Sequence, residues 1–472
     1  MTSTVTMKSH LLRSAAIAAL GGLLFGFDTA VISGAEGTLR EIYAPAYAVL
    51  AGIIGNESFW HGFTVASALI GTIIGALIFG KPADRYGRRS MLFAIGIMYF
   101  ISALFCALAP NWSIFVIMRF IGGLAVGGSS VVAPMYNAEI SPAQFRGRMV
   151  ALTQFNIVFG ILLAYLSNYF ISSLNLGDLT WRWMFGVEAF PALAFVLLLF
   201  LNPRSPRWLV RNNLSEEAKK VLFRLGADQE DLNKEISEIQ LSLRAEHTTS
   251  RERFFQAKYF QPILLAVTIA MFNQLSGINA ILYYAPRVFE MAGFAKSAAM
   301  LSSVGIGMVM MLFTLFAMLI IDHFGRKKLM FAGSIGYILS LATIAITFYS
   351  SGSDFSDTSG LVVLISLMVF IAAHGFGQGA VIWVFISEIF PNKIRARGQA
   401  LGSFTHWFMA ALISWTFPVF ANISGGHVFT FYAFCMVLQL LWVIFIMPET
   451  KGVPLEQLQT TLLKRPQTRS EN

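Results

Sequence analysis

Long apolar stretches constrain the fold of this chain of 472 residues more than any other feature. We count twelve of them, each about 20 residues long, which is the length at which a helix crosses the hydrocarbon core of a bilayer. Hydrophobic residues make up 56% of the sequence and charged residues only 12%, far from the balance of a soluble protein. The sequence therefore predicts an all-α membrane protein with twelve transmembrane helices.

Six stretches precede a polar central segment and six follow it. The predicted spans are residues 12–34, 60–81, 90–110, 113–135, 149–172 and 183–202, then 260–285, 298–321, 328–350, 360–387, 398–421 and 427–447. The central segment is rich in Arg, Lys, Glu and Leu, and we expect either short amphipathic helices at the membrane surface or a solvated linker. The predicted organisation is an N-terminal six-helix bundle, a cytoplasmic linker, a C-terminal six-helix bundle and a cytoplasmic tail, at residues 1–202, 203–258, 259–456 and 457–472.

A charged motif that follows the second predicted span occurs twice. Residues 80–89 read GKPADRYGRR, and residues 321–328 read IDHFGRKK at the equivalent place in the second half. A second motif, EISP from Glu139, returns as EIFP from Glu388, and each copy is followed by an arginine, Arg146 and Arg395, with which we expect the glutamate to pair. Motifs that repeat in the same order at nearly one spacing indicate a duplicated chain. We therefore expect two similar six-helix halves.

The repeated motifs place carboxylates beside guanidinium groups at predicted helix ends. Such groups form charge-assisted hydrogen bonds that can bridge neighbouring helices. We expect these residues to close the cytoplasmic side of the protein and to separate when that side opens. The alternative is that the arginines only anchor the topology. The predicted cytoplasmic gate consists of Asp84, Arg85, Arg88, Glu139, Arg146, Asp322, Arg326, Glu388 and Arg395.

The positive charges lie mainly on one side of the predicted topology. Of the 34 Lys and Arg residues, Arg119 lies within a span, and those assigned to the opposite loops are Arg40, Arg182, Arg287 and Lys296. The positive-inside rule therefore places both termini and the central segment in the cytoplasm, in a multi-pass protein of the cytoplasmic (inner) membrane. The net charge of +9 is thus explained by the orientation of the chain in the lipid bilayer, and no nucleic-acid partner is predicted.

The sequence carries no signature of catalysis. Cys106 and Cys435 both lie within apolar stretches, so no disulfide framework is predicted. We find no grouping of a nucleophile with a base and no cluster with metal-ligand spacing. The chain is therefore not expected to be an enzyme, nor to carry a metal or a cofactor.

Taken together, the spans and motifs resemble the sugar-porter branch of the major facilitator superfamily. The resemblance extends from about residue 12 to 456, and the segments that carry it are Gly80–Arg89, Arg119 before Gly122-Gly123, Glu139–Arg146, Pro203–Leu209, Gln274–Asn279 and Pro448–Gly452. It implies two six-helix bundles that rock around a central site and expose it alternately to each side. It also implies a monosaccharide substrate, and we expect the protein to function as a monomer.

Polar side chains within the spans are the candidate substrate ligands, because each is costly in hydrocarbon unless it has a partner or lines a cavity. Neutral amides can pair with sugar hydroxyl groups, and an aromatic ring can pack on a pyranose face. The resemblance assigns sugar contact to Gln154, Gln274, Asn279 and Trp383, with Tyr283 or Tyr284 lining or gating the path. The full candidate set is Gln154, Asn273, Gln274, Asn279, Tyr283, Tyr284, Trp383, His406 and Trp407.

Two features limit the substrate prediction. His406 stands where the family has an amide, so the class of sugar carries over from the resemblance but the particular sugar does not. An isolated tryptophan such as Trp383 can equally be a packing residue.

Three ionisable residues within the spans indicate how transport is energised: Asp28, Arg119 and Glu188. By resemblance, the position of Asp28 is Asp in bacterial proton-coupled symporters and Asn in animal facilitative carriers. A buried carboxylate there can take up a proton and lose it near Arg119. Glu188 resembles a second carboxylate of the symporters. The alternative for Asp28 is a permanent structural ion pair with Arg119.

The sequence thus predicts a secondary active transporter that couples proton entry to the uptake of a pentose or hexose. The main alternative is a facilitator that carries a sugar or polyol downhill, with Asp28 serving structure alone. A membrane sugar sensor is a third interpretation, but we expect such a protein to carry a longer cytoplasmic tail than the residues after Leu455.

Overall fold

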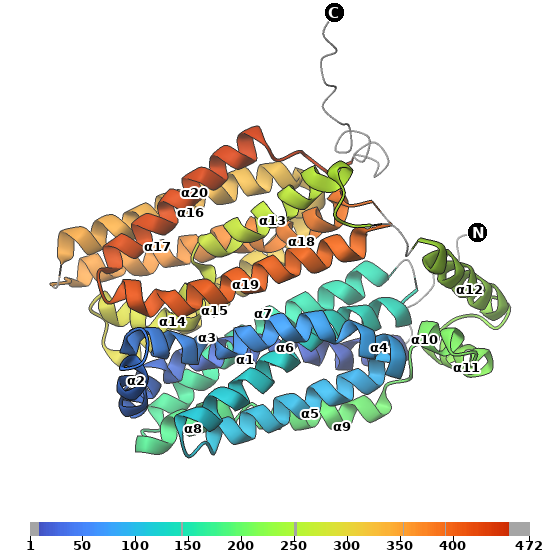
Figure 1. Cartoon of the computed structure of the whole chain (residues 1–472), viewed down its shortest axis with the longest axis horizontal. Helices are drawn as coiled ribbons and strands as arrows, with labels where there is room; N and C mark the ends of the chain where they lie inside the picture. Colours follow the sequence, from blue (N-terminus) through green and yellow to red (C-terminus); the bar gives the residue numbers. More distant parts are fainter. Residues whose placement is uncertain (1–8, 143–144, 250–252, 353, 392, 453–472) are drawn as a thin grey trace, which may run out of the picture. The chain divides into compact units, whose positions relative to one another are not determined.

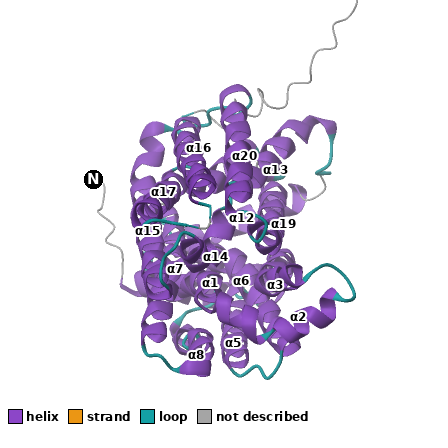
Figure 2. Ribbon diagram, turned by 90° about the vertical axis from the view of Figure 1, so that its left-hand side faces the viewer, coloured by secondary structure: helices purple, strands orange, loops and turns teal. Residues whose placement is uncertain are grey.

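The structure of the protein is a computed structural model that describes residues 9–142, 145–249, 253–352, 354–391 and 393–452. Helices form nearly all of this part of the chain, and no strand occurs in it (Figure 1, Figure 2). Twelve helical segments of the described residues are long and apolar enough to cross a membrane. The prediction of an all-α protein with twelve transmembrane helices is confirmed.

Contacts along the chain define two compact units. The first comprises Met1–Ala35 and Ser67–Ser250, and the second comprises Glu36–Ala66 and Arg251–Asn472. The first and third helices, α1 (Ser9–Ile42) and α3 (Glu57–Ile78), therefore each contribute residues to both units. The sequence predicts a division into two six-helix halves separated by a linker. That division stays a prediction.

The remaining elements of the first unit are α4 (Gly80–Tyr86), α5 (Arg88–Ala107), α6 (Trp112–Ile140), α7 (Arg146–Ser173), η1 (Gly177–Leu179), α8 (Thr180–Gly186), α9 (Ala189–Leu198), η2 (Leu199–Leu201), α10 (Pro206–Arg211), α11 (Ser215–Leu225) and α12 (Leu232–Thr249). The last three lie in the central segment (Figure 1). In α11 the buried residues Ala218, Val221, Leu222 and Leu225 recur at the spacing of one helix face, so the predicted short amphipathic helices are present.

The remaining elements of the second unit are α2 (Ala44–Ala51), η3 (Ala257–Tyr259), α13 (Phe260–Leu275), α14 (Ile278–Met291), α15 (Lys296–Phe324), α16 (Arg326–Ser351), α17 (Asp357–Phe376), α18 (Gln378–Ile389), α19 (Arg395–Ala421) and α20 (Gly425–Phe445). Polar caps define several helix starts in both units. The Asn111 side chain accepts a hydrogen bond from the backbone N–H of Ile114, and Ser356 and Ser359 form a capping box at the start of α17.

Three spans that the sequence predicts as continuous are broken. The sixth is interrupted between α8 and α9, the seventh between α13 and α14, and the tenth between α17 and α18 at Gly377. Gly277, between α13 and α14, has φ of 86°, and a Cβ there would overlap the ring of Tyr432. Breaks of this kind free backbone and side-chain polar groups at membrane depth, which is where transporters place their sites.

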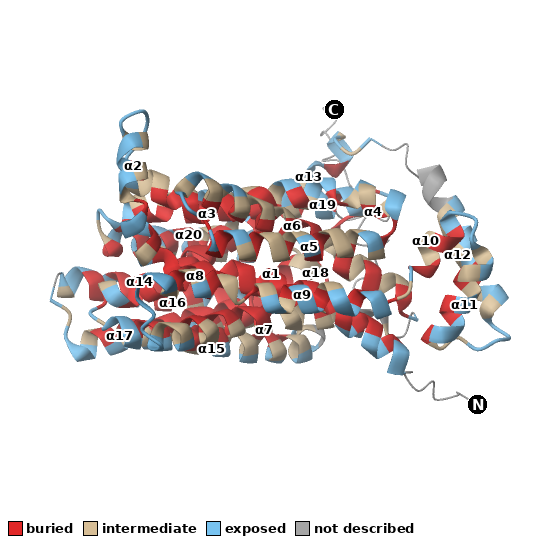
Figure 3. Ribbon diagram, turned by 90° about the horizontal axis from the view of Figure 1, so that it is seen from below, coloured by how far each residue is buried: buried red, intermediate tan, exposed pale blue. Residues whose placement is uncertain are grey.

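Large apolar side chains are exposed along the spans, interspersed with buried positions (Figure 3). Leu319 is 73% exposed, Leu339 64% and Phe445 79%. Exposed apolar surface on this scale is unfavourable in water, whereas hydrocarbon solvates it. The exposed faces thus support the membrane assignment independently of helix length.

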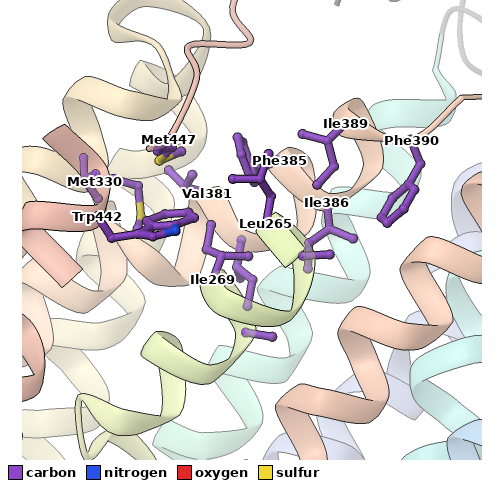
Figure 4. Packing of buried hydrophobic residues seen from close by; sticks show 14 of the residues in the cluster. Leu265, Ile269, Met330, Val381, Phe385, Ile386, Ile389, Phe390, Trp442 and Met447 are labelled. Atoms are coloured by element: carbon purple, nitrogen blue, oxygen red, sulfur yellow. The ribbon is translucent and has the colours of Figure 1, made fainter. Parts of the chain in front are cut away.

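Buried apolar residues of α13, α16, α18 and α20 form a compact cluster in the second unit (Figure 4). Its largest member is Trp442, which is 6% exposed. Trp383 is partly buried and packs against this cluster. The cluster therefore supports α13 and α18, which carry the candidate ligands Asn273, Gln274 and Trp383.

Helices α1 and α7 pack so closely in the first unit that their crossing requires glycine. A Cβ on Gly26 would overlap the backbone oxygen of Ile157. A Cβ on Gly160 would likewise overlap the backbone oxygen of Leu23. We expect Gly26→Ala to destabilise the protein by about 1–3 kcal/mol through overpacking. Thermal unfolding of the purified variant measures this effect.

Gly37 provides a matched control on the same helix, because nothing lies within 4 Å of a Cβ at that position. Gly37→Ala should be neutral or stabilising by up to about 1 kcal/mol, since alanine is the better helix former. Equal melting temperatures for the two variants would contradict the close crossing of α1 and α7.

Candidate functional site

The predicted proton-coupling residues meet in the core of the first unit. The Arg119 Nη1 donates to Asp28 Oδ1 at 2.6 Å, and its Nη2 donates to the Asp28 backbone oxygen at 3.3 Å. Asp28 is 3% exposed, Arg119 1% and Glu188 1%. Glu188 interacts electrostatically with both of the others, and its Oε1 has no hydrogen-bond partner among the described residues. Arg119 therefore pairs with Asp28 away from solvent, and Glu188 is a second buried carboxyl group that interacts electrostatically with this pair.

Local structure explains how this group is placed. Asp28 comes from α1 and Arg119 from α6, while Glu188 lies at the break between α8 and α9. A Cβ on Gly122 would lie 3.3 Å from Asp28 Oδ1, so the small residue one turn after Arg119 leaves room for the carboxylate. The Arg119 guanidinium also lies 5.5 Å from the ring of Phe185, a favourable position for a cation over an aromatic face.

Four of the predicted sugar ligands come together in the second unit. The Gln274 Nε2 donates to Asn273 Oδ1 at 2.9 Å and lies 3.4 Å from both ring nitrogens of His406. The ring centroids of Trp383 and His406 are 5.0 Å apart. Amides, an imidazole and an indole from α13, α18 and α19 thus form one polar and aromatic group. Its chemistry suits hydroxyl groups and the apolar face of a sugar ring.

The other predicted ligands are less directly connected to this group. Trp407 packs edge-on against His406, with centroids 4.8 Å apart, and Asn279 and Tyr283 are buried in α14. The Tyr284 hydroxyl donates to the Ser414 backbone oxygen at 3.0 Å. Gln154 is half-buried on α7 in the first unit. The roles assigned to these residues stay predictions.

The charged motif of the first half forms a partly buried cluster, in which Arg88 and Glu139 are buried and Asp84 is 43% exposed. Arg88 lies 2.8 Å from Asp84 Oδ1 and 2.9 Å from Glu139 Oε1, and Ser205 donates to the other oxygen of Glu139. Arg85 lies over the ring of Tyr86, 5.3 Å from its centroid. The side chain of Arg146 lies outside the described part of the structure, so its predicted pairing with Glu139 is not addressed.

The second half repeats this arrangement with different supporting residues. Arg326 binds Glu388 through two hydrogen bonds of 2.8 and 3.2 Å, and Thr450 donates to Glu388 Oε2 at 2.6 Å. The sequence predicted Glu388 to pair with Arg395, and this is wrong for the described structure. Arg395 Nε instead donates to the Phe390 backbone oxygen at 3.4 Å. The side chain of Asp322 lies outside the described residues.

Glu449 anchors this second cluster from the end of the last span. Its carboxylate accepts the backbone N–H groups of Arg326 and Lys327, the first two residues of α16, and those of Thr450 and Lys451. Burial acts to raise the pKa of the Glu449 carboxyl, but these four N–H donors outweigh it and hold the pKa below its ordinary value. Glu449 therefore stays ionised at neutral pH, where its charge favours the N-terminus of α16.

A family model described as "Sugar (and other) transporter" matches residues 14–462. The chain belongs to this family. The curated relatives include the D-xylose-proton symporter of Escherichia coli K12, which is 36% identical over 98% of this chain and 97% of the relative. The arabinose-proton symporter of Bacillus subtilis is 35% identical over 95% of this chain and 94% of its own length.

A solved structure of the E. coli xylose transporter in an inward-open conformation matches with a TM-score of 0.83 and 35% identity, covering 96% of this chain and 99% of that one. The fold is therefore that of the major facilitator superfamily, as predicted. The protein is a multi-pass membrane transporter of the sugar-transporter family and not an enzyme.

The structure also reveals a buried ionic cluster of this sugar transporter that the sequence did not predict. Glu36 Oε1 lies 2.7 Å from His61 Nε2 and 3.0 Å from Arg287 Nη1, and Arg287 also donates to Asn422 Oδ1. Glu36 is 4% exposed, His61 1% and Arg287 9%. The predicted topology places Arg287 in a loop, whereas it is buried in α14. A signal was present, because Glu36 and His61 are ionisable residues at the edges of apolar stretches.

Substitution of Trp383 distinguishes a role in sugar recognition from a role in packing alone. We expect Trp383→Ala to weaken sugar binding at least about tenfold, because the residue supplies an aromatic face beside His406. Trp383→Phe should retain most of the affinity, since it keeps a ring at that position. Trp442→Phe is the matched control, because Trp442 belongs to the apolar cluster and should alter melting temperature but not affinity. Unchanged affinity in Trp383→Ala at normal expression would make Trp383 a packing residue only.

Proposed function

We propose that this protein is a proton-coupled symporter of a monosaccharide, a pentose or a hexose, that works by alternating access in the cytoplasmic membrane. In this proposal it acts as a monomer with both termini in the cytoplasm. The observation that carries it is the buried group of Asp28, Arg119 and Glu188, in which Arg119 pairs with Asp28 and a second carboxyl group interacts electrostatically with both.

The charge of this group provides the coupling. If both carboxyl groups are ionised, the group carries one net negative charge at membrane depth, which is costly. Binding of one proton neutralises it, so occupancy by a proton and the conformation of the unit depend on each other. Deprotonated Asp28 has an ion-pair partner in Arg119, and protonation weakens that pair. The site therefore has two states that differ in charge and in contacts.

The choice of substrate is supported by the second unit and by the relatives. The amide, imidazole and indole side chains of Gln274, His406 and Trp383 offer hydrogen bonds and an aromatic face without a formal charge. The relatives include a symporter of protons with D-xylose and one of protons with arabinose. A neutral monosaccharide is the substrate class that fits both.

A facilitator of a sugar or polyol is the alternative, and one observation favours it. The Asp28–Arg119 pair is short and buried, as a permanent structural ion pair would be. Uptake of labelled pentoses and hexoses into vesicles that lack their own carriers distinguishes the two functions. A symporter accumulates one of these sugars above the external concentration only with an inward proton gradient, and a protonophore abolishes the accumulation. A facilitator equilibrates the sugar and is unaffected by the protonophore.

A further inference from the structure

Five buried polar side chains of the second unit form one continuous hydrogen-bonded chain. Gln439 Nε2 donates to Ser334 Oγ at 2.8 Å, Gln378 Nε2 to Gln439 Oε1 at 2.7 Å, and Asn273 Nδ2 to Gln378 Oε1 at 3.3 Å. The chain ends at Gln274, whose Nε2 donates to Asn273 Oδ1 at 2.9 Å. None of the five is more than 2% exposed. Helices α16, α20, α18 and α13 supply the members in that order.

The chain has a direction, and Ser334 sets it. The Ser334 hydroxyl carries one hydrogen, which it donates to the Met330 backbone oxygen at 2.7 Å. Its oxygen is therefore left to accept, so Gln439 must point its NH₂ group towards it. A carboxamide has its acceptor at one end and its donors at the other, so each amide in turn fixes the orientation of the next.

The direction determines what Gln274 presents. Its NH₂ group is engaged by Asn273 and faces the ring of His406. Its Oε1 is buried and accepts no hydrogen bond from the described residues. A buried carbonyl oxygen without a donor is unfavourable, so this atom is suited to a ligand that brings a donor.

We propose that Ser334, Gln439 and Gln378 are positioning residues for sugar recognition, which orient Gln274 so that its carbonyl oxygen accepts a hydrogen bond from one hydroxyl group of the substrate. The proposal rests on the proposed function, in which Gln274 contacts the sugar. It makes the site specific for a substrate that has a hydrogen-bond donor at that position. Sugars with fluorine, hydrogen or an ether oxygen there are discriminated against, because none of these can donate.

Binding of deoxy and deoxyfluoro analogues of the preferred monosaccharide to the purified, full-length protein tests this inference. In the wild type, one ring position should exist at which the deoxyfluoro and the deoxy analogue both bind at least about tenfold more weakly than the parent sugar. At a position where the sugar can supply either an acceptor or a donor, the deoxyfluoro analogue should instead bind more tightly than the deoxy analogue.

Ser334→Ala removes the group that sets the direction, whereas Ser334→Thr retains a hydroxyl that can donate to the same helix carbonyl. In Ser334→Ala we expect weaker binding of the parent sugar and a smaller penalty for fluorine, because Gln274 can then turn its NH₂ group to the ligand. Ser334→Thr should keep the wild-type profile across the analogues. Gln439→Met, which breaks the next link, should reproduce the profile of Ser334→Ala and serves if that variant is unstable.

The outcomes separate this inference from the proposed function. If the wild type binds no pentose or hexose, the proposed function fails and the inference fails with it. If the wild type binds a sugar but fluorine is tolerated at every position, Gln274 does not present an acceptor and only the inference is overturned. An analogue profile that is the same in the wild type, Ser334→Ala and Gln439→Met overturns it as well, because a purely structural network would alter stability without altering that profile.

Discussion

We expect Asp28→Asn to abolish sugar accumulation driven by the proton gradient and to leave sugar exchange intact. Asparagine keeps the size of the side chain and its capacity for hydrogen bonds but fixes the neutral form, which mimics the protonated carrier. The loaded carrier can then still cross between its two states, so counterflow of labelled against unlabelled sugar continues. The empty carrier has no proton to release inside, so net uphill uptake falls to simple equilibration. Accumulation and counterflow are measured in the same vesicles.

Glu188→Gln is the matched comparison, because it neutralises the other carboxyl group of the same buried cluster. If Asp28 is the coupling residue, Glu188→Gln should slow accumulation or shift its pH dependence without abolishing it. Accumulation that survives in Asp28→Asn would exclude Asp28 as the coupling residue and make Glu188 the next one to test. Loss of both accumulation and counterflow in Asp28→Asn would instead indicate that the ion pair with Arg119 is needed for the fold.

We expect Glu388→Leu to lower the stability of the folded protein by up to about 3 kcal/mol, the lower end of the range for removal of one partner from a buried ion pair, because the Glu388 side chain is 23% exposed. The Arg326 side chain is 10% exposed and loses the carboxylate that accepts its hydrogen bonds of 2.8 and 3.2 Å. Thr450, which donates to the same carboxylate, loses its acceptor as well. Thermal or denaturant unfolding of the purified protein measures the loss.

Two controls decide whether the buried pair is the cause. The double variant Arg326→Leu, Glu388→Leu should recover part of the loss, because it leaves no uncompensated charge. Glu216→Ala removes a carboxylate whose side chain is 82% exposed and pairs with Lys219, so its effect on stability should be small. A Glu388→Leu variant no less stable than Glu216→Ala would show that the second charged cluster does not support the fold.

The two charged clusters share an Arg–Glu pair that both copies of the repeated motifs retain. Arg88 with Glu139 and Arg326 with Glu388 occupy equivalent places in the repeated motifs, and in both halves a hydroxyl group donates to the glutamate. The second cluster adds Glu449, which caps α16 through backbone N–H groups. A gating role for both clusters is consistent with these contacts and stays a prediction.

The sequence by itself determined the number of spans, the fold class and the residue types of the candidate sites. These depend on local properties: twenty apolar residues in succession require a bilayer wherever they occur, and an aspartate within such a stretch requires a partner. The pairing of Asp28 with Arg119 could also be predicted, because few other charged side chains lie within the spans of the first half. The motifs then identified the family before any geometry was known.

Only the tertiary structure decided which polar groups meet. It pairs Glu388 with Arg326 instead of Arg395, brings Glu36 beside His61 and Arg287, and breaks three spans that hydropathy predicts as continuous. It also joins Ser334 of α16 to Gln274 through amides of α20, α18 and α13. The physical reason is that these contacts depend on how each helix is rotated and where it crosses its neighbours. Close packing of side chains over the whole bundle sets that rotation, and no pattern along one helix encodes it.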